Sequence, residues 1–278
     1  MLVGSAPSEL KLGSTTVTGV RRGAGLIYDS DVAAFQKSSG ATQVGPLLAL
    51  VDYLKAQSLW DYARFYPMKS AQNAGSGSTV YGLGGLTSNN MTLINSPTWG
   101  SDGVTFDAAS SQAGTISDFM NGGTVSLWWK GTNTAAGGSC VLSQYDYGAN
   151  ERSVGILKGT VAPLNVQIRR SSSGLAGVDT EYFEGLAFSG DLQVLSAEWI
   201  DGGGRTLWVN KDPQIISYVT GGVQTERLNA TCDISVMSLL NNGSPSDFAS
   251  GVAVFVGFIE TALTTTQRET ITDLINAL

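Results

Sequence analysis

The residues in this sequence best suited to acid–base catalysis are the acids of the run Asp179-Thr180-Glu181-Tyr182-Phe183-Glu184. Two carboxyl groups about 5 Å apart can act as nucleophile and acid/base in retaining glycosidases. On a strand, Asp179 and Glu181 would share one face. However, the run departs from the Glu-x-Asp-x-x-Glu pattern of such enzymes at its first acid, and its neighbours lack the apolar pattern of a strand. We therefore interpret the run as a solvated loop and predict no catalytic residue.

The sequence contains no histidine. This absence removes Ser-His-Asp and Cys-His catalysis, the usual zinc sites and a histidine pH switch. Hydrolases that work with carboxylates alone need no histidine, so a polysaccharide hydrolase or lyase stays open as an alternative. The two cysteines, Cys140 and Cys232, have two readings. They are either small buried residues on strands, which we favour, or a single disulfide across the sheets.

A calcium site would need several oxygen ligands close together. The candidate ligands are the acids and amides of predicted turns, namely Asp102, Asp107, Asn150, Asp201 and Asn210. None of them belongs to a dense Asp-x-Asp cluster. Asp and Asn are also common in turns because their side chains bond to the nearby backbone. We therefore predict no metal and no cofactor.

The loop 144–150 is the best candidate for contact with an external ligand, because it mixes aromatic and polar residues. Tyr145 and Tyr147 could stack on the flat faces of sugar rings. Asp146 and Asn150 could accept or donate hydrogen bonds to the same ligand. An ordinary surface loop would explain this composition as well.

Alternating residues predict the strands that must position these loops. In the segment 124–130, Val125, Leu127 and Trp129 lie on one face, whereas Trp128 lies on the other. A two-sheet sandwich with a covering helix would bury both faces, so we expect Trp128 to be buried. The segment 251–259 is apolar on both faces, as expected for a strand inside such a sandwich.

Turn and cap signals divide the rest of the chain. An Asp-Gly pair at 102–103 predicts a hairpin. The glycine-rich stretch 201–204 predicts a second hairpin between strands 192–200 and 205–210. Gly45-Pro46 begins a predicted helix that runs to about residues 58–60. Thr264 and Gln267 form a capping-box pair at the start of a C-terminal helix.

Together these segments resemble the laminin-G/concanavalin A-like jelly roll. The segment 95–107 matches the family's Trp, Gly and Phe pattern through Trp99, Gly103 and Phe106, and 124–130 matches its "T-v-S-l-W-v-K" strand. The resemblance implies an all-β fold: a two-sheet antiparallel jelly-roll sandwich with a short N-terminal β-arm and two peripheral helices. Such a sandwich binds or displays more often than it catalyses. Lys211 replaces the family's glycine after Asn210, which puts the tight turn there in doubt.

The N-terminal residues differ from this pattern. Lys11–Thr18 is echoed ten residues later by Arg21–Tyr28, with a basic residue, a glycine and aliphatic or β-branched residues at matching positions. Two short strands joined by a turn would explain the echo, but a lone hairpin needs another surface to pack on. The repeat resembles short N-terminal segments of tailed-bacteriophage virion proteins; an ordinary hairpin folded onto its own domain is the alternative. We expect an assembly arm at 1–40, a linker helix at 41–63 and the sandwich at 64–278.

Composition limits the partners. The chain has 278 residues, a net charge of −7 and no long basic run, which disfavours a nucleic-acid partner. The first residues lack the basic and apolar regions of a secretory signal, and the apolar run 251–259 is too short to span a bilayer. We therefore expect a soluble product with no membrane insertion.

These observations lead to one main hypothesis and two alternatives. The main hypothesis is a non-enzymatic bacteriophage virion protein, a head decoration or tail fibre, made in the host cytoplasm. It would form a homo-oligomer, contact other virion proteins through residues 1–40, and adhere to a host surface polysaccharide through loop 144–150. The alternatives are a cell-surface glycan-binding domain unrelated to virions and a polysaccharide hydrolase or lyase.

Overall fold

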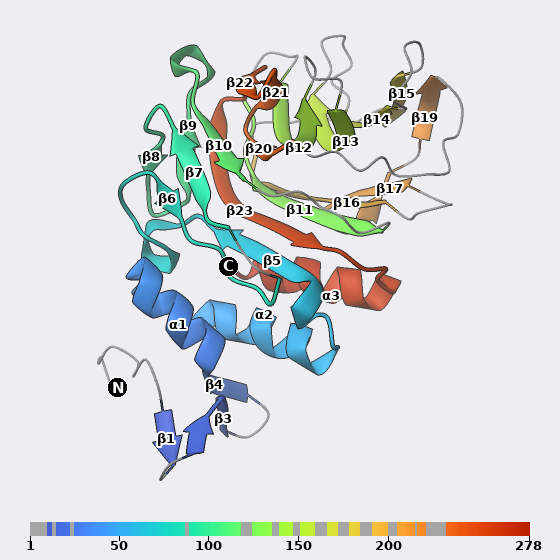
Figure 1. Cartoon of the computed structure of the whole chain (residues 1–278). Coiled ribbons are helices and arrows are strands. Elements are labelled where there is room, and N and C mark those ends of the chain that lie inside the picture. The colour runs from blue at the N-terminus through green and yellow to red at the C-terminus, as the bar shows by residue number, and fades with distance from the viewer. Residues whose placement is uncertain are drawn as a thin grey trace.

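The chain folds into two facing β-sheets, with helices along the outer surface of the smaller sheet (Figure 1). The computed structural model describes residues 10–12, 15–22, 25–86, 89–117, 124–134, 139–146, 151–158, 166–171, 178–183, 191–199, 205–214, 216–220 and 232–278. The predicted all-β sandwich is confirmed. Within the described residues, no helix combines the length and the hydropathy needed to cross a bilayer.

The larger sheet has eleven strands in the described part of the chain, with the main order β19-β15-β14-β13-β12-β20-β10-β7-β6. Neighbours along this path are antiparallel, and β21 joins β12 in parallel through Asp146 and Leu240. The strands are β6 (Thr79–Val80), β7 (Met91–Ile94), β10 (Ala113–Ile116), β12 (Ser139–Asp146), β13 (Glu151–Lys158), β14 (Val166–Ser171), β15 (Val178–Phe183), β19 (Ile216–Thr220), β20 (Ile234–Val236), β21 (Leu239–Asn241) and β22 (Ser244–Ser246).

The smaller sheet has the order β18-β17-β16-β11-β23-β9-β8, and β5 pairs with the second half of β23. Its strands are β5 (Ala63–Pro67), β8 (Thr98–Trp99), β9 (Val104–Phe106), β11 (Val125–Gly131), β16 (Gln193–Trp199), β17 (Arg205–Val209), β18 (Asp212–Pro213) and β23 (Gly251–Ile259). The antiparallel pairs β8–β9 and β16–β17 confirm both predicted hairpins.

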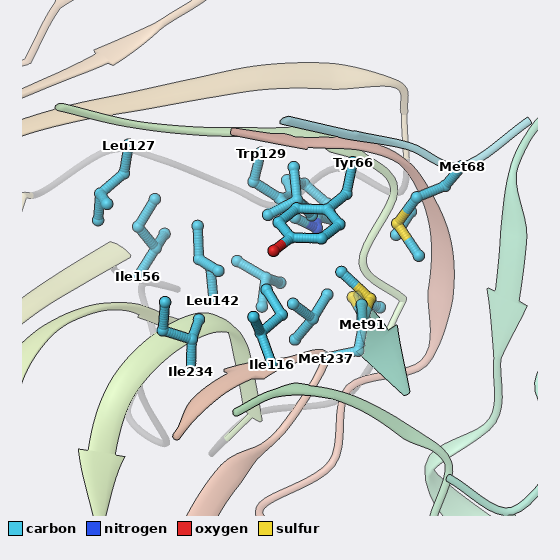
Figure 2. Close-up of a cluster of buried hydrophobic side chains, with 14 of the residues drawn as sticks. Tyr66, Met68, Met91, Ile116, Leu127, Trp129, Leu142, Ile156, Ile234 and Met237 are labelled. Atoms are coloured by element: carbon cyan, nitrogen blue, oxygen red, sulfur yellow. The ribbon is translucent and has the colours of Figure 1, made fainter. Parts of the chain in front are cut away.

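Strand β11 is buried on both faces, as its alternation predicts. Val125, Leu127 and Trp129 belong to the core between the sheets. Trp128 points the other way into a second core beneath the helices, and both tryptophans are 0% exposed. Figure 2 shows Leu127 and Trp129 within the inter-sheet core, beside Leu142 and Ile156 of the opposite sheet. Because each aromatic side chain buries roughly 150–250 Å², this strand holds the two cores together.

Three α-helices cover the outer face of the smaller sheet: α1 (Ser30–Ser39), α2 (Gly45–Ala56) and α3 (Thr265–Asn276). Short 3₁₀ turns η1 (Trp60–Tyr62), η2 (Ser70–Gln72) and η3 (Ala108–Ser110) complete the helical elements of the described residues. Helix α2 begins at the predicted residue but ends earlier, at Ala56. The predicted capping box of α3 is confirmed, since Thr264 accepts the backbone N–H of Gln267 and the Gln267 side chain accepts that of Thr264.

Helix α1 was not predicted, and it lies inside the segment we assigned to the arm. Its start is capped by Asp29, whose side chain accepts the N–H groups of Asp31 and Val32, and Gly40 ends it with φ 73°. Val32 and Phe35 are buried in the same core as Trp128. Residues 30–39 therefore pack as part of the body.

Two further sequence expectations concern single residues. Asn210 and Lys211 form the tight turn between β17 and β18, with φ of 53° and 89°. The missing glycine therefore does not prevent the turn, and Lys211 makes a 2.7 Å ion pair with Asp273 of α3.

Cys140 is buried and Cys232 is half buried, and the two are not disulfide-bonded to each other.

Helix α3 is tied to the even-numbered face of β11 by polar contacts. The Trp128 indole N–H donates to Thr272 Oγ1 at 3.2 Å. The Lys130 ammonium donates to the carbonyls of Ile275 and Asn276 at 3.0 Å each, which satisfies two groups at the helix C-terminus. Burial, together with the nearby charge of Lys69, lowers the pKa of Lys130 from 10.5 to about 8.

We predict that Lys130 makes stability depend on pH above neutrality. The unfolded chain binds the Lys130 proton more tightly than the native state does. The free-energy cost of burying the charged Lys130 side chain in the folded state is therefore fully present below pH 8. This cost decreases as the pH rises towards 10.5. Relative to Lys130→Met, the wild type should gain about 2 kcal/mol between about pH 7.5 and pH 9.5. Urea unfolding of both proteins measures this, with Lys37→Met on the exposed side of α1 as the control. A difference that does not change with pH would contradict it.

Candidate functional site

The structure places the predicted ligand loop only in part. Tyr145 lies on β12, while Tyr147 and Asn150 fall outside the described residues. Asp146 is only 2% exposed. Its two carboxylate oxygens accept the backbone N–H groups of Asn242 at 2.7 Å and Gly243 at 2.5 Å. The prediction that Asp146 contacts an external ligand is therefore corrected: this carboxylate holds the turn between β21 and β22.

The described part of the acidic run, residues 179–183, lies on a strand and not on the loop that we predicted. Asp179 and Glu181 belong to β15, which pairs with β14 on one side and β19 on the other. The register sets Arg170 opposite Asp179. The polar composition misled the prediction, because hydrogen bonding to strands on both sides stabilises β15 without apolar alternation.

The predicted turn chemistry is confirmed at Asp107, whereas Asn210 bonds to a neighbouring strand. Asp107 accepts the Ala109 N–H at 3.0 Å and the Ser110 hydroxyl at 2.7 Å. The Ser110 hydrogen bond, followed by that of Ala109, lowers the pKa of Asp107. Asn210 Oδ1 accepts the Val194 N–H at 2.9 Å. Asp102 lies in the β8–β9 turn, and Asn150 and Asp201 lie outside the described residues. Among the residues that are described, no three His, Cys, Asp or Glu side chains gather as metal ligands.

The N-terminal segment forms two separate hairpins. Strands β1 (Leu10–Leu12) and β2 (Thr15–Val17) make one, and β3 (Gly19–Arg22) and β4 (Gly25–Asp29) make the other. Each half of the sequence echo is therefore a hairpin, where we had expected a single strand. Figure 1 shows both hairpins extending from the helical side of the sandwich.

The second hairpin is docked on α2 by an ion pair. The Arg21 guanidinium donates to both carboxylate oxygens of Asp52, at 2.9 Å from Nη1 to Oδ2 and at a shorter distance from Nη2 to Oδ1. Such paired contacts fix orientation as well as position. Arg21 is half exposed, with 50% of its side-chain surface accessible, so water screens this pair.

A second ion cluster joins the hairpin, α1 and α2. Lys55 Nζ lies 2.7 Å from Asp29 Oδ2 and 2.5 Å from Asp31 Oδ2. Burial alone would lower the pKa of Lys55, but the hydrogen bonds and charges of Asp29 and Asp31 together raise it. Asp29 is 4% exposed and also caps α1. Lys55 therefore compensates a buried charge at the point where arm and body meet.

Two hollows meet at the Arg21–Asp52 pair. One, of about 280 Å³, is lined by mostly polar and charged residues, including Thr18, Asp29 and Lys55. The other, of about 450 Å³, lies between α2 and α3. We call the second the helix groove and define it by its apolar lining: Leu48, Ala49, Tyr53, Ala56 and Leu274. Sequence periodicity alone could not reveal it, because the groove depends on how α2 and α3 pack side by side.

A third hollow, of about 340 Å³, lies between α1 and the loop that follows β6. We call it the α1 groove. The residues that line it include Asp31, Ser38, Tyr81 and Asn90. The backbone of Tyr81 is held by Asn73, which bonds both its N–H and its carbonyl at 2.9 Å. The volume falls within the range of small-ligand sites.

Comparison with known proteins supports the fold. No family model and no curated protein matches this chain. Trypanosoma rangeli sialidase has a TM-score of 0.51 at 12% identity, covering 82% of this chain and 39% of the sialidase chain. The same enzyme in complex with 2,3-difluorosialic acid has a TM-score of 0.52 at 12% identity, covering 76% of this chain and 33% of the other. This chain therefore spans only 39% of the length of the first structure it matches.

We predict that the Lys55 cluster and the Arg21–Asp52 ion pair contribute unequally to the stability of the fold. Lys55→Met should destabilise the fold by about 2 kcal/mol, because it removes charged hydrogen bonds and leaves Asp29 buried without its cation. Arg21→Ala should cost less than about 1 kcal/mol, because that pair is exposed to water. Urea unfolding at neutral pH would measure both, with Lys37→Met as the control for loss of a surface cation. Equal costs at the two sites would contradict the prediction.

Proposed function

We propose that this protein is a non-enzymatic structural protein that assembles through residues 1–29 and displays its sandwich on the surface of the assembly. One observation carries the proposal. The β1–β2 hairpin extends from the body and pairs with no other strand in the described part of the chain (Figure 1). Two-stranded sheets of this length are not stable alone in water. Assembly would give this hairpin a further surface to pack on.

We draw the assembly segment shorter than the predicted 1–40, because α1 packs with the body through Val32 and Phe35. The Lys55 cluster then serves as the joint between the segment and the sandwich. The Lys55 cluster fixes the base of the segment, and the first hairpin extends from the body. This arrangement suits docking onto neighbouring molecules.

The particle that we propose is a tailed-bacteriophage virion, in which this protein is a head decoration or a tail fibre. The support is the resemblance of residues 11–28 to N-terminal segments of virion proteins. We propose no enzymatic activity, because the acids at 179–184 depart from the catalytic pattern. Trypanosoma rangeli sialidase shares the fold at 12% identity, and that likeness does not extend its activity to this chain.

Removing the first hairpin tests the assembly role. We expect a chain that lacks residues 1–17 to keep the melting temperature of the full chain, because the Arg21–Asp52 and Lys55 contacts remain. We also expect it to sediment as a monomer under conditions where the full chain sediments as an oligomer. A chain that lacks residues 1–28 keeps the Asp29 cap and the Lys55 contacts but loses the Arg21–Asp52 pair. It should also sediment as a monomer, with a melting temperature slightly below that of the full chain. If either truncated chain assembled like the full chain, residues 1–17 would not be the assembly segment.

Adhesion to a surface polysaccharide is a second candidate function, and the α1 groove favours it. Its lining combines one aromatic residue, Tyr81, with the polar residues Asp31, Ser38 and Asn90, which are residue types that can stack on a sugar ring and hydrogen-bond to it. The groove lies on the face formed by α1 and the loop after β6, well away from β12, which carries Tyr145. The two locations can therefore be separated by mutation.

A glycan array probed with the assembled protein tests adhesion. Tyr81→Ala should weaken binding about tenfold, as expected when one stacking contact of about 1.4 kcal/mol is lost. Tyr62→Ala is the matched control, because Tyr62 is 47% exposed and lies outside the groove. If Tyr145→Ala with Tyr147→Ala abolished binding while Tyr81→Ala did not, the site would lie at the predicted loop. Absence of binding to every glycan would remove the adhesion role.

A further inference from the structure

The turn between β21 and β22 contains an Asn-Gly pair. The register of the two strands sets Asn241 opposite Ser244, so Asn242 and Gly243 are the central residues of the turn. Both have positive φ, 51° and 76°, as in the type I′ turn that this pair favours. Asn241, Asn242 and Gly243 are all exposed. Water therefore has access to the dipeptide.

An asparagine that precedes glycine is prone to deamidation, because glycine has no side chain to hinder the reaction. The Gly243 nitrogen would lose its proton and form a bond to Asn242 Cγ, and the side-chain nitrogen would leave as ammonia. Water would then open the cyclic imide at either of its carbonyls, which gives aspartate or isoaspartate. One water is consumed and one ammonia is released. The reaction begins at the Gly243 N–H, so a group that holds this proton controls the rate.

Asp146 holds that proton. The Gly243 N–H donates to Asp146 Oδ2 at 2.5 Å, and the Asn242 N–H donates to Oδ1 at 2.7 Å. The carboxylate is on a residue that is only 2% exposed, and hydrogen bonds to a charged group are strong where water is excluded. Removal of the Gly243 proton would place a negative nitrogen beside a negative carboxylate. Asp146 therefore opposes the first step of deamidation.

The local backbone also depends on these contacts. The Asn242 side-chain amide donates to Asn241 Oδ1 at 3.4 Å, so it is directed towards the preceding residue and not towards the Gly243 nitrogen. Met237 and Asp247, which flank the hairpin, have φ of 59° and 47°. Non-glycine residues keep such values only where the surrounding structure fixes them. The hairpin is therefore a segment that needs its anchor on β12.

We infer that Asn242-Gly243 is a site of spontaneous deamidation and that the buried Asp146 carboxylate protects it. Reaction requires the β21–β22 hairpin to open, because both N–H groups are held while it is closed. Isoaspartate would add one carbon atom to the backbone of the turn, so the two N–H groups could not return to the same carboxylate. An opening that leads to reaction would become permanent. This inference is independent of the proposed assembly and adhesion roles.

Deamidation of the full-length wild type is the first test. The protein is incubated in mildly alkaline buffer, folded or denatured in guanidinium chloride, and mass spectrometry follows the peptide that contains Asn242. The folded protein should react more than about tenfold more slowly than the denatured one, which corresponds to about 1.4 kcal/mol. Asn121-Gly122, the other Asn-Gly pair of the chain, gives the reference rate of this dipeptide in the denatured protein.

Asp146→Asn removes the negative charge and keeps the shape of the side chain. The folded variant should deamidate at Asn242 at least about tenfold faster than the folded wild type, whereas the denatured proteins should react at equal rates. Asp107→Asn is the matched control, because Asp107 is also a turn carboxylate and accepts the Ala109 N–H at 3.0 Å. It should leave the Asn242 rate unchanged. A cooperative unfolding transition would show that each variant is folded.

Amide hydrogen exchange gives a second measurement that needs no variant. In the folded wild type, the Gly243 amide should exchange more than about tenfold more slowly than in the denatured chain, because exchange also requires the hairpin to open. Three results would overturn the inference. The first is an equal Asn242 rate in folded and denatured wild type. The second is a folded Asp146→Asn variant that deamidates no faster than the wild type. The third is a Gly243 amide that exchanges at the rate of the denatured chain.

Discussion

The burial of β11 on both of its faces is the constraint on which the rest of this structure depends. Trp128 and Trp129 are adjacent in the chain, their side chains point in opposite directions, and each side chain is fully buried. The second sheet covers Trp129, but Trp128 would face water if the sandwich were the whole protein. Loss of either side chain would cost about 3–5 kcal/mol. A layer of helices over the smaller sheet is therefore part of the fold and not an addition to it.

The helical layer is positioned by polar contacts as well as by apolar packing. Arg268 of α3 lies 3.5 Å from the Glu198 carboxylate and 3.5 Å from the centre of the Trp208 ring, so its buried charge has partners on two strands. Lys130 covers the carbonyls at the end of the same helix. Buried charges contribute little net stability, but they are costly to misplace. They therefore restrict α3 to one position along the sheet.

This fixed position is what gives the helical side its surface features. The helix groove lies between α2 and α3, and the α1 groove lies between α1 and the loop after β6. The same Asp29 pairs with Lys55 and ends β4, so one buried carboxylate links the hairpins to the body. Features that suit assembly and adhesion thus lie on the helical side of the molecule. The sequence had directed attention to a loop at the end of β12.

The sequence alone determined the elements whose signals are local. Alternation predicted β11 and β23, the Asp-Gly pair predicted the β8–β9 hairpin, and the capping pair of Thr264 and Gln267 predicted the start of α3. Helix α1 was missed, although Asp29 and Gly40 are ordinary cap residues, because its apolar pattern is short. Only the tertiary structure decided which polar groups are structural. Asp146 is buried because the distant residues Asn242 and Gly243 return to it, and β15 is a strand because neighbours pair on both sides. Contacts between residues far apart in the chain carry no signal in local composition, so the Arg21–Asp52 pair, the Lys55 cluster and both grooves could be recognised only once the chain was folded.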